Sequence, residues 1–212
     1  MNRCRELLGD SEPLMQILYS LRLGDGSFVT QSQTTKNYYL MVSSVSLQYV
    51  SFKKTMLERF GVITQSLRES KSGFKSSSII YSFGTRNHPL ISKVASMSVK
   101  EVVSSLNKEG LSLYYLDDGT FHQKKHFGHL CCNTFTSEEV ESLIDVLFRL
   151  YPIKRCSARY DRKKDGRAYP YVYIPVSVMR EFKKDIKSTI DKYELTDFKY
   201  KIGEQEVFVQ CC

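Results

Sequence analysis

Two aspartates in this 212-residue chain stand directly before a glycine, at the ends of two similar apolar segments. Asp25 closes residues 18–26 (LYSLRLGDG), and Asp118 closes residues 111–119 (LSLYYLDDG). A single Asp-Gly pair after a helix is ordinarily a turn, but two of them at the ends of equivalent helices are harder to dismiss. Carboxylates are ligands for hard cations, and two that approach closely need a cation between them. Asp25 and Asp118 are therefore the candidates for chemistry.

The elements that must position these acids follow a repeated order. Apolar residues at helical spacing predict a helix before Asp25, and alternating or β-branched stretches predict strands after it. The first set is a helix ending at Gly24, strands at 27–34 and 38–45, a helix at 47–60, strands at 62–70 and 77–83, and a short helix after Pro89. The second set is a helix ending at Asp118, strands at 120–125 and 128–135, a helix to about 150, strands at 153–161 and 168–174, and a helix at 178–193.

The repeated order predicts a duplicated α+β fold. Positions 25 and 118 are too far apart for a solenoid repeat, whose period is typically about 20 to 50 residues. We expect two αββαββα halves, residues 1–97 and 98–212, that form two antiparallel four-stranded sheets.

Composition and charge narrow the function classes. Hydrophobic residues make up 42% of the chain, which is enough for a core and excludes a disordered chain. A net charge of +8 and a pI near 9.1 favour a polyanionic partner without proving one. No apolar run approaches the roughly 18 residues of a membrane span. The six cysteines include no CxxC pair, and with no signal-peptide pattern they predict a soluble protein of a reducing intracellular compartment, in the cytoplasm or an organelle.

At the level of motifs the chain resembles the LAGLIDADG homing endonuclease family. Both segments match that motif in length, in the leading leucine and in the terminal Asp-Gly, and the second fits the form YxxDDGxF common in the family. The resemblance covers about residues 12 to 203, including the late segment FKYKI. One departure is Tyr19, which replaces the small alanine of the motif, whereas the matching position in the second helix is Ser112.

The resemblance implies a monomeric, Mg²⁺-dependent endonuclease that saddles double-stranded DNA and makes a staggered double-strand break. Mn²⁺ or Ca²⁺ would substitute for Mg²⁺ in binding. Asp25 and Asp118 would be the catalytic metal ligands, with Gly24 and Asp117 as neighbouring metal contacts. Asp117 is also open to interpretation as a surface residue at the helix end, which we favour.

Family members also place a lysine near each active centre. From their position after the second strand pair of each half, Lys100 and Lys201 are the candidates for this role. Taken singly, each is also explained as a solvated lysine.

The predicted strands and turns supply the side chains for contacting DNA. Gln and Arg read base edges bidentately in the major groove, whereas a basic turn contacts phosphate. The candidates are Gln31, Gln33, Lys36, Arg68, Lys71, Lys75, Lys124, Arg155, Arg159, Arg162, Lys163, Lys164 and Arg167.

Two other groups of residues have ordinary explanations. Tyr169, Tyr171 and Tyr173 alternate along one strand; they could contact DNA, but we favour packing of these rings against helices. The histidines of residues 122–129 lack a cysteine pair at metal spacing, so we expect no zinc site and interpret them as strand residues facing phosphate or solvent.

Two other function classes stay open. A non-catalytic nucleic-acid binder, such as a maturase that assists splicing of its intron RNA or a transcription factor that reuses the fold, would explain the charge. Retention of both Asp25 and Asp118 favours the enzyme over such a binder, whose function needs no paired acids. A generic α+β interaction domain explains the charge poorly. The enzyme would promote the spread of its host intron or intein.

Overall fold

The computed structural model describes residues 12–30, 37–71, 79–162 and 166–204. The chain divides into two compact units, unit 1 (Met1–Gly110) and unit 2 (Leu111–Cys212). The division falls inside a helix and lies later in the chain than the predicted boundary between residues 97 and 98.

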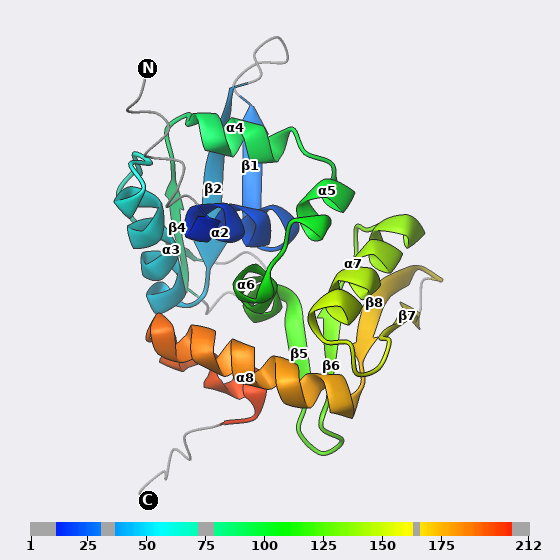
Figure 1. Cartoon of the computed structure of the whole chain (residues 1–212). Helices are drawn as coiled ribbons and strands as arrows, with labels where there is room; N and C mark the ends of the chain where they lie inside the picture. Colours follow the sequence, from blue (N-terminus) through cyan, green and yellow to red (C-terminus); the bar gives the residue numbers. More distant parts are fainter. Residues whose placement is uncertain (1–11, 31–36, 72–78, 163–165, 205–212) are drawn as a thin grey trace, which may run out of the picture. The chain divides into compact units, whose positions relative to one another are not determined.

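Unit 1 contains the first set of elements in the predicted order (Figure 1). They are α2 (Glu12–Leu23), β1 (Gly26–Thr30), β2 (Tyr38–Ser44), α3 (Leu47–Arg59), β3 (Arg68–Lys71), β4 (Ile79–Gly84), α4 (Pro89–Ala95) and α5 (Val99–Ser104). The four strands form an antiparallel sheet in the order β1-β2-β4-β3.

The second set repeats this order. It consists of α6 (Lys108–Asp118), β5 (Gly119–His122), β6 (Phe127–Cys131), α7 (Ser137–Leu150), β7 (Ser157–Arg162), β8 (Ala168–Ile174), α8 (Val176–Lys192) and the 3-10 helix η1 (Thr196–Ile202). The sheet order β5-β6-β8-β7 reproduces that of unit 1 position by position. The predicted duplicated α+β fold is therefore confirmed.

Each sheet has one face against helices and one open face. In unit 1 the strands direct Leu40, Val42 and Phe83 toward the helices, and all three are buried. In unit 2, Leu130, Val172 and Ile174 lie on the face covered by α7 and α8 and are fully buried. Because side chains alternate along a strand, the residues between these positions form the open face.

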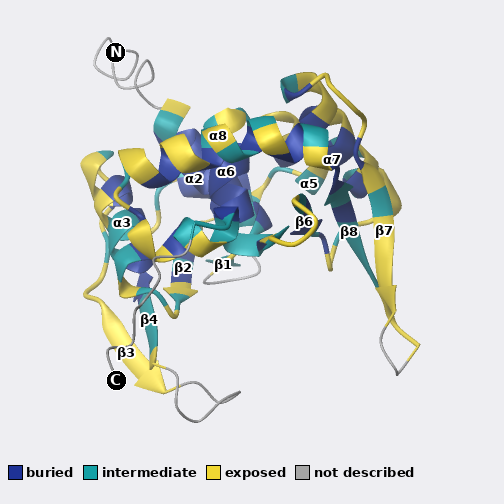
Figure 2. Cartoon of the chain, turned by 90° about the horizontal axis from the view of Figure 1, so that it is seen from below, coloured by how far each residue is buried: buried dark blue, intermediate teal, exposed yellow. Residues whose placement is uncertain are grey.

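The open faces are less buried than the helix-covered faces, and β3 and most of β7 are exposed, as the yellow strands of Figure 2 show. Exposed polar and charged side chains on a sheet contribute little to packing the core, and they are available to a partner.

The connection from α5 to α6 is fixed by a buried glutamine of α2. Gln16 Nε2 donates to Glu12 Oε1 at 2.8 Å and to the Ser105 carbonyl at 3.0 Å, and the Asn107 amide donates to Gln16 Oε1 at 3.0 Å. A Cβ at Gly110 would collide with the Gln16 amide. Every polar atom of this buried side chain is thus paired, which fixes the start of α6 within unit 1.

Two predicted strands begin later than expected. Residues 62–67 make only the isolated bridge Thr64–Thr85, and β3 starts at Arg68. Residues 153–156 form a turn after Pro152, and β7 starts at Ser157. Turns before these strands carry apolar residues, such as the exposed Ile63 and Ile153, that imitate strand periodicity.

Candidate functional site

The first motif ends in a short turn. The helix α2 stops at Leu23, the Gly24 amide donates to the Ser20 carbonyl at 2.9 Å, and Asp25 is exposed before β1 starts. A Cβ on Gly26 would collide with the carbonyl of Leu21. Glycine is required here because the new strand leaves in contact with the helix backbone. The tight turn sets Asp25 at the helix end.

The second motif reaches its acid without a turn. The helix α6 continues through Asp117 and Asp118, both half-buried, and β5 begins at Gly119. A Cβ on Gly119 would collide with the ring and carbonyl of the buried Tyr115. Asp117 is therefore partly covered at the helix end, and its role stays a prediction.

Lys201 lies at the end of this second motif. Its Nζ donates to the Gly119 carbonyl at 2.7 Å and to the Asp117 carbonyl at 3.3 Å. The 3-10 helix η1 brings Lys201 there and ends at Gly203, whose φ is 73°. The positive charge lies where the carbonyls of α6 concentrate negative charge, so the contact is favourable.

Lys100 lies in a different setting. It is in the first turn of α5, its side chain is exposed, and within the described residues it makes no hydrogen bond or ion pair. In unit 2, Lys201 thus contacts the end of the motif helix, whereas in unit 1 Lys100 makes no such contact with any described residue.

Each acid, taken within its own unit, fits a cation site that a substrate completes. Within the described ranges, no group of three or more His, Cys, Asp or Glu side chains could by itself hold a metal ion. Mg²⁺ is usually bound through one or two carboxylates, with waters and substrate phosphates completing the shell. An Asp carboxylate at each motif end, with the Gly24 carbonyl and Asp117 beside it, is a donor set of this kind.

The open face of the unit 1 sheet is small and mostly uncharged. The register aligns Ser27 with Met41 and Gly84, and Ser43 with Ser82 and Arg68. Arg68 is exposed and its Nη2 donates to Gln65 Oε1 at 3.3 Å. This face therefore carries one predicted DNA-contacting side chain among the residues that the structure describes.

The open face of the unit 2 sheet is aromatic and hollowed. A groove of about 690 Å³ is lined by residues of all four strands and their connections. Its lining includes Thr120, His122, His129, Asp161, Arg167 and Tyr171. Arg159 stacks over Tyr173, with its guanidinium carbon 3.8 Å from the ring centroid. This stacking holds the guanidinium over the face.

The prediction that the tyrosines of β8 pack against helices is wrong. The helix-side positions of that strand are Val172 and Ile174, so the alternating tyrosines lie on the opposite, open face. The signal for this was the alternation itself, since the valine and isoleucine between them are the more apolar set.

The histidines His122 and His129 were not predicted as a unit. Their rings meet on adjacent strands, with His122 Nε2 and His129 Nδ1 3.1 Å apart. Burial, followed by the neighbouring His122 and Arg159, lowers the pKa of His129 to about 4. The register between the two strands cannot be read from the sequence, so the contact between these rings could not be predicted.

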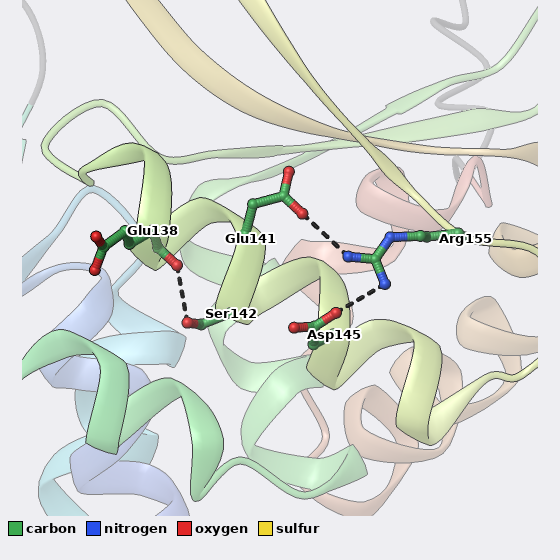
Figure 3. Close-up of polar contacts among 5 residues, drawn as sticks. All are labelled: Glu138, Glu141, Ser142, Asp145 and Arg155. Atoms are coloured by element: carbon green, nitrogen blue, oxygen red, sulfur yellow. Dashed lines mark hydrogen bonds and ion pairs between the residues drawn. The ribbon is translucent and has the colours of Figure 1, made fainter.

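Arg155 lies away from the open face, contrary to the prediction of a DNA-contacting strand residue. Its Nη2 lies 3.0 Å from Glu141 and its Nη1 2.8 Å from Asp145, both on α7 (Figure 3). These two carboxylates raise the pKa of the guanidinium. Because β7 starts two residues later, Arg155 belongs to the turn beside α7.

The remaining predicted contacts are distributed over turns and edges. Lys71, Lys124, Arg162 and Arg167 are exposed, and Arg167 lines the groove of unit 2. Outside the described residues lie Gln31, Gln33, Lys36, Lys75, Lys163 and Lys164.

Comparison with known proteins places the chain in a family. Residues 15–182 match the LAGLIDADG DNA endonuclease family, and the chain belongs to it. Among curated proteins, no sequence matches this chain.

Solved structures share the fold. The homing endonuclease I-WcaI bound to its DNA recognition sequence is 20% identical, with a TM-score of 0.68 over 92% of this chain and 88% of that one. I-DmoI in complex with DNA and Mn is 14% identical, with a TM-score of 0.59 over 84% of this chain and 98% of that one.

A third structure with this fold is full-length DUF199/WhiA from Thermatoga maritima, 10% identical, with a TM-score of 0.56 over 89% of this chain and 62% of that one. A shared fold does not by itself establish cleavage. Among the described residues, no helix is long and apolar enough to cross a membrane.

Proposed function

We propose that this protein is a site-specific endonuclease that hydrolyses one phosphodiester bond in each strand of a DNA duplex and leaves staggered ends. The observation that carries the proposal is the repetition of one arrangement, a carboxylate at the end of a motif helix followed by a glycine at which a Cβ would collide with its neighbours. Membership in the LAGLIDADG DNA endonuclease family supports it.

Asp25 and Asp118 are the proposed ligands of Mg²⁺, with the Gly24 carbonyl and Asp117 as neighbouring contacts. When bound, the cation supplies Lewis acidity toward a phosphate oxygen and lowers the pKa of bound water. Because the two carboxylates are the hard oxygen donors of their motifs, replacing either with an amide removes the charge that holds the cation. Mn²⁺ is expected to replace Mg²⁺, and Ca²⁺ to support binding.

Lys201 is the proposed basic residue of unit 2. Its two contacts to the carbonyls flanking Asp118 hold the end of α6 and place a positive charge beside the acid. A phosphodiester that approaches Asp118 therefore meets a cationic group as well as a carboxylate, which favours the developing negative charge. Lys100 remains the candidate for unit 1 from its position in the sequence.

The open faces of the two sheets are the proposed DNA-reading surfaces. Arg68 and Arg159 project from them, and Arg162 and Arg167 lie at the turn of β7 and β8, where they would contact phosphates. Lys71 and Lys124 add positive charge at exposed edges. The protein is expected to act as a monomer and to spread the intron or intein that encodes it.

Cleavage of a randomised duplex library tests the proposal. The purified protein is incubated with Mg²⁺ and the library, and cleaved ends are sequenced. We expect a recurring site with staggered ends, and a loss of rate greater than about a hundredfold in Asp25→Asn and in Asp118→Asn. Asp145→Asn is the matched control, because its exposed carboxylate on α7 pairs with Arg155 instead.

Two results would contradict the nuclease. One is a wild-type protein that cuts no member of the library, and the other is a pair of Asp→Asn variants that cut as fast as the wild type. Tighter binding to an intron RNA than to any duplex would support the maturase.

A further inference from the structure

The two histidines of the unit 2 groove form a hydrogen-bonded pair. His122 lies on β5 and His129 on β6, their ring centroids are 4.4 Å apart, and the rings meet at 60°. The inner nitrogens, His122 Nε2 and His129 Nδ1, are 3.1 Å apart. At this distance one ring donates its N–H and the other accepts with its lone pair, so the inner nitrogens share one hydrogen.

This sharing fixes what the outer nitrogens can offer. In the neutral pair, one outer nitrogen carries a hydrogen and the other has a lone pair, and the direction of the inner bond decides which. Adding one proton gives both outer nitrogens a hydrogen while the inner bond is kept. A second proton would oppose two N–H groups and break the inner bond.

The rings are held in place but their outer nitrogens remain available. His122 stacks on Phe127 at 4.2 Å, and His129 lies 4.4 Å from the ring of Tyr171. Within the described residues, neither outer nitrogen is hydrogen bonded, and neither is a buried atom without a partner. Both histidines line the groove, so a ligand in the groove can reach them.

The groups facing the pair come from every neighbouring strand. The titratable and charged ones are Cys131 on β6, Tyr169, Tyr171 and Tyr173 on β8, Arg159 and Asp161 on β7, and Arg167 before β8. Burial and the positive neighbours hold the pKa of His129 down to about 4, which keeps that ring neutral in the free protein near pH 7. The phosphates of a duplex would act in the opposite direction and favour a proton on the pair.

Base edges in the major groove differ in the same property. Adenine presents one acceptor and one donor, whereas guanine presents two acceptors. The neutral pair complements adenine and the singly protonated pair complements guanine.

We propose that the His122–His129 pair reads a base edge of the bound DNA and takes up one proton to accept guanine, so that base preference in the unit 2 half of the site changes with pH. This rests on the proposed function, because it specifies how the same protein selects its target. The pair is a specificity determinant and takes no part in hydrolysis.

The test repeats the library cleavage at about pH 6 and about pH 8, on either side of the ordinary histidine titration. For the wild type we expect guanine to be enriched at one or more positions at the lower pH and adenine at the same positions at the higher pH. Affinity for the guanine duplex should rise by up to about tenfold per pH unit lowered. Thermal melting of each variant establishes that it is folded.

The informative variants are His122→Gln and His129→Gln. A glutamine amide keeps one donor and one acceptor at every pH, but each single variant retains one imidazole of the pair. The pH response should therefore be reduced in each single variant and absent in the double variant His122→Gln/His129→Gln, which should keep the base preference of the wild type at the higher pH. His126→Asn is the matched control: His126 is in the same hairpin, beside Phe121, its φ of 54° suits asparagine, and it lies outside the groove. This control should keep the pH response.

A measurement on the wild type covers variants that fail to fold. Titration of the histidine rings by NMR, with and without the selected guanine duplex, should show the pKa of His129 raised by the DNA. Equal base preference at both pH values would contradict the proposed role of the histidine pair. An unchanged pH response in the glutamine variants would do the same. Neither result would contradict the proposed nuclease function. Absence of cleavage at both pH values contradicts the nuclease, and this inference with it.

Discussion

In unit 1 the motif helix stops at Leu23 and a turn leaves Asp25 exposed, whereas in unit 2 the helix continues through a half-buried Asp118 into the strand. The open faces differ in the same direction. The open face of unit 1 presents serines, Met41 and Arg68. The open face of unit 2 has a groove lined by aromatic rings and histidines, and Arg159 lies over Tyr173 on the same face.

The fold is thus repeated in the two units, but the surroundings of the two acids are not. Lys201 contacts the end of α6 through η1, and the equivalent region of unit 1 is the short α5 with an exposed Lys100. The two halves would therefore recognise unlike half-sites, and their acids would work in different electrostatic settings. Matched substitutions in the two units test that asymmetry.

Substituting the two candidate lysines should have unequal consequences. Lys201→Met removes the charge and both hydrogen bonds at the carbonyls beside Asp118, so single-turnover cleavage should slow by about 10- to 100-fold. Lys100→Met, at an exposed position, should slow it less. DNA affinity, measured in Ca²⁺, separates lost binding from lost catalysis. Equal losses in the two variants would mean that the halves are functionally equivalent.

The motif glycines should also differ. Gly119→Ala forces a methyl group against the buried ring of Tyr115, which should lower the free energy of unfolding by about 1 to 3 kcal/mol. Gly26→Ala meets the backbone and Cβ of Leu21 but no aromatic ring, so its loss should be smaller. Urea denaturation of both variants measures the difference, and a larger loss in Gly26→Ala would contradict this explanation.

The two arginines near β7 should separate recognition from packing. Arg159→Ala removes a guanidinium held over the open face and should weaken duplex binding by about 1 to 3 kcal/mol, or roughly 5- to 150-fold. Arg155→Ala loses its ion pairs with α7 and should leave affinity unchanged while lowering the melting temperature slightly. Fluorescence anisotropy with the selected duplex measures affinity; reduced affinity in Arg155→Ala would place that residue back on the DNA surface.

Acidification should destabilise unit 2 through His129. Its pKa is lowered from 6.5 to about 4 in the folded protein, so between these values the unfolded chain binds more protons than the folded one. The contribution to stability is therefore present above pH 6.5 and is lost as the pH falls toward 4. Denaturation at several pH values should show a smaller decline for His129→Gln than for the wild type. An identical decline would assign the effect to other groups.

Much of the fold followed from local patterns. The helix before each Asp-Gly pair and the order of strands agree with the structure, because each depends on spacing within a few residues. The helices that begin after Ser98 and Thr136 have capping boxes, which also depend on such local spacing. The capping boxes satisfy amide groups that a helix start otherwise leaves unpaired. Errors occurred where apolar residues in turns imitated strands, at residues 62–67 and 153–156.

The candidate site divides in the same way. The positions of Asp25 and Asp118 at helix ends could be predicted, since a helix that must stop at a glycine fixes where its last acid lies. The contact of Lys201 with α6, the ion pairs of Arg155 and the pairing of His122 with His129 could not. Each of these depends on a partner distant in sequence or on the register between strands.

The sequence by itself therefore determined the duplication, the two acids and their glycines, because helix periodicity and backbone freedom are local properties. Only the tertiary structure decided that Lys201 contacts the end of α6 and that His122 and His129 share a hydrogen. A shift of one residue in strand register would move every side chain to the other face, and no local pattern in these short strands fixes that register.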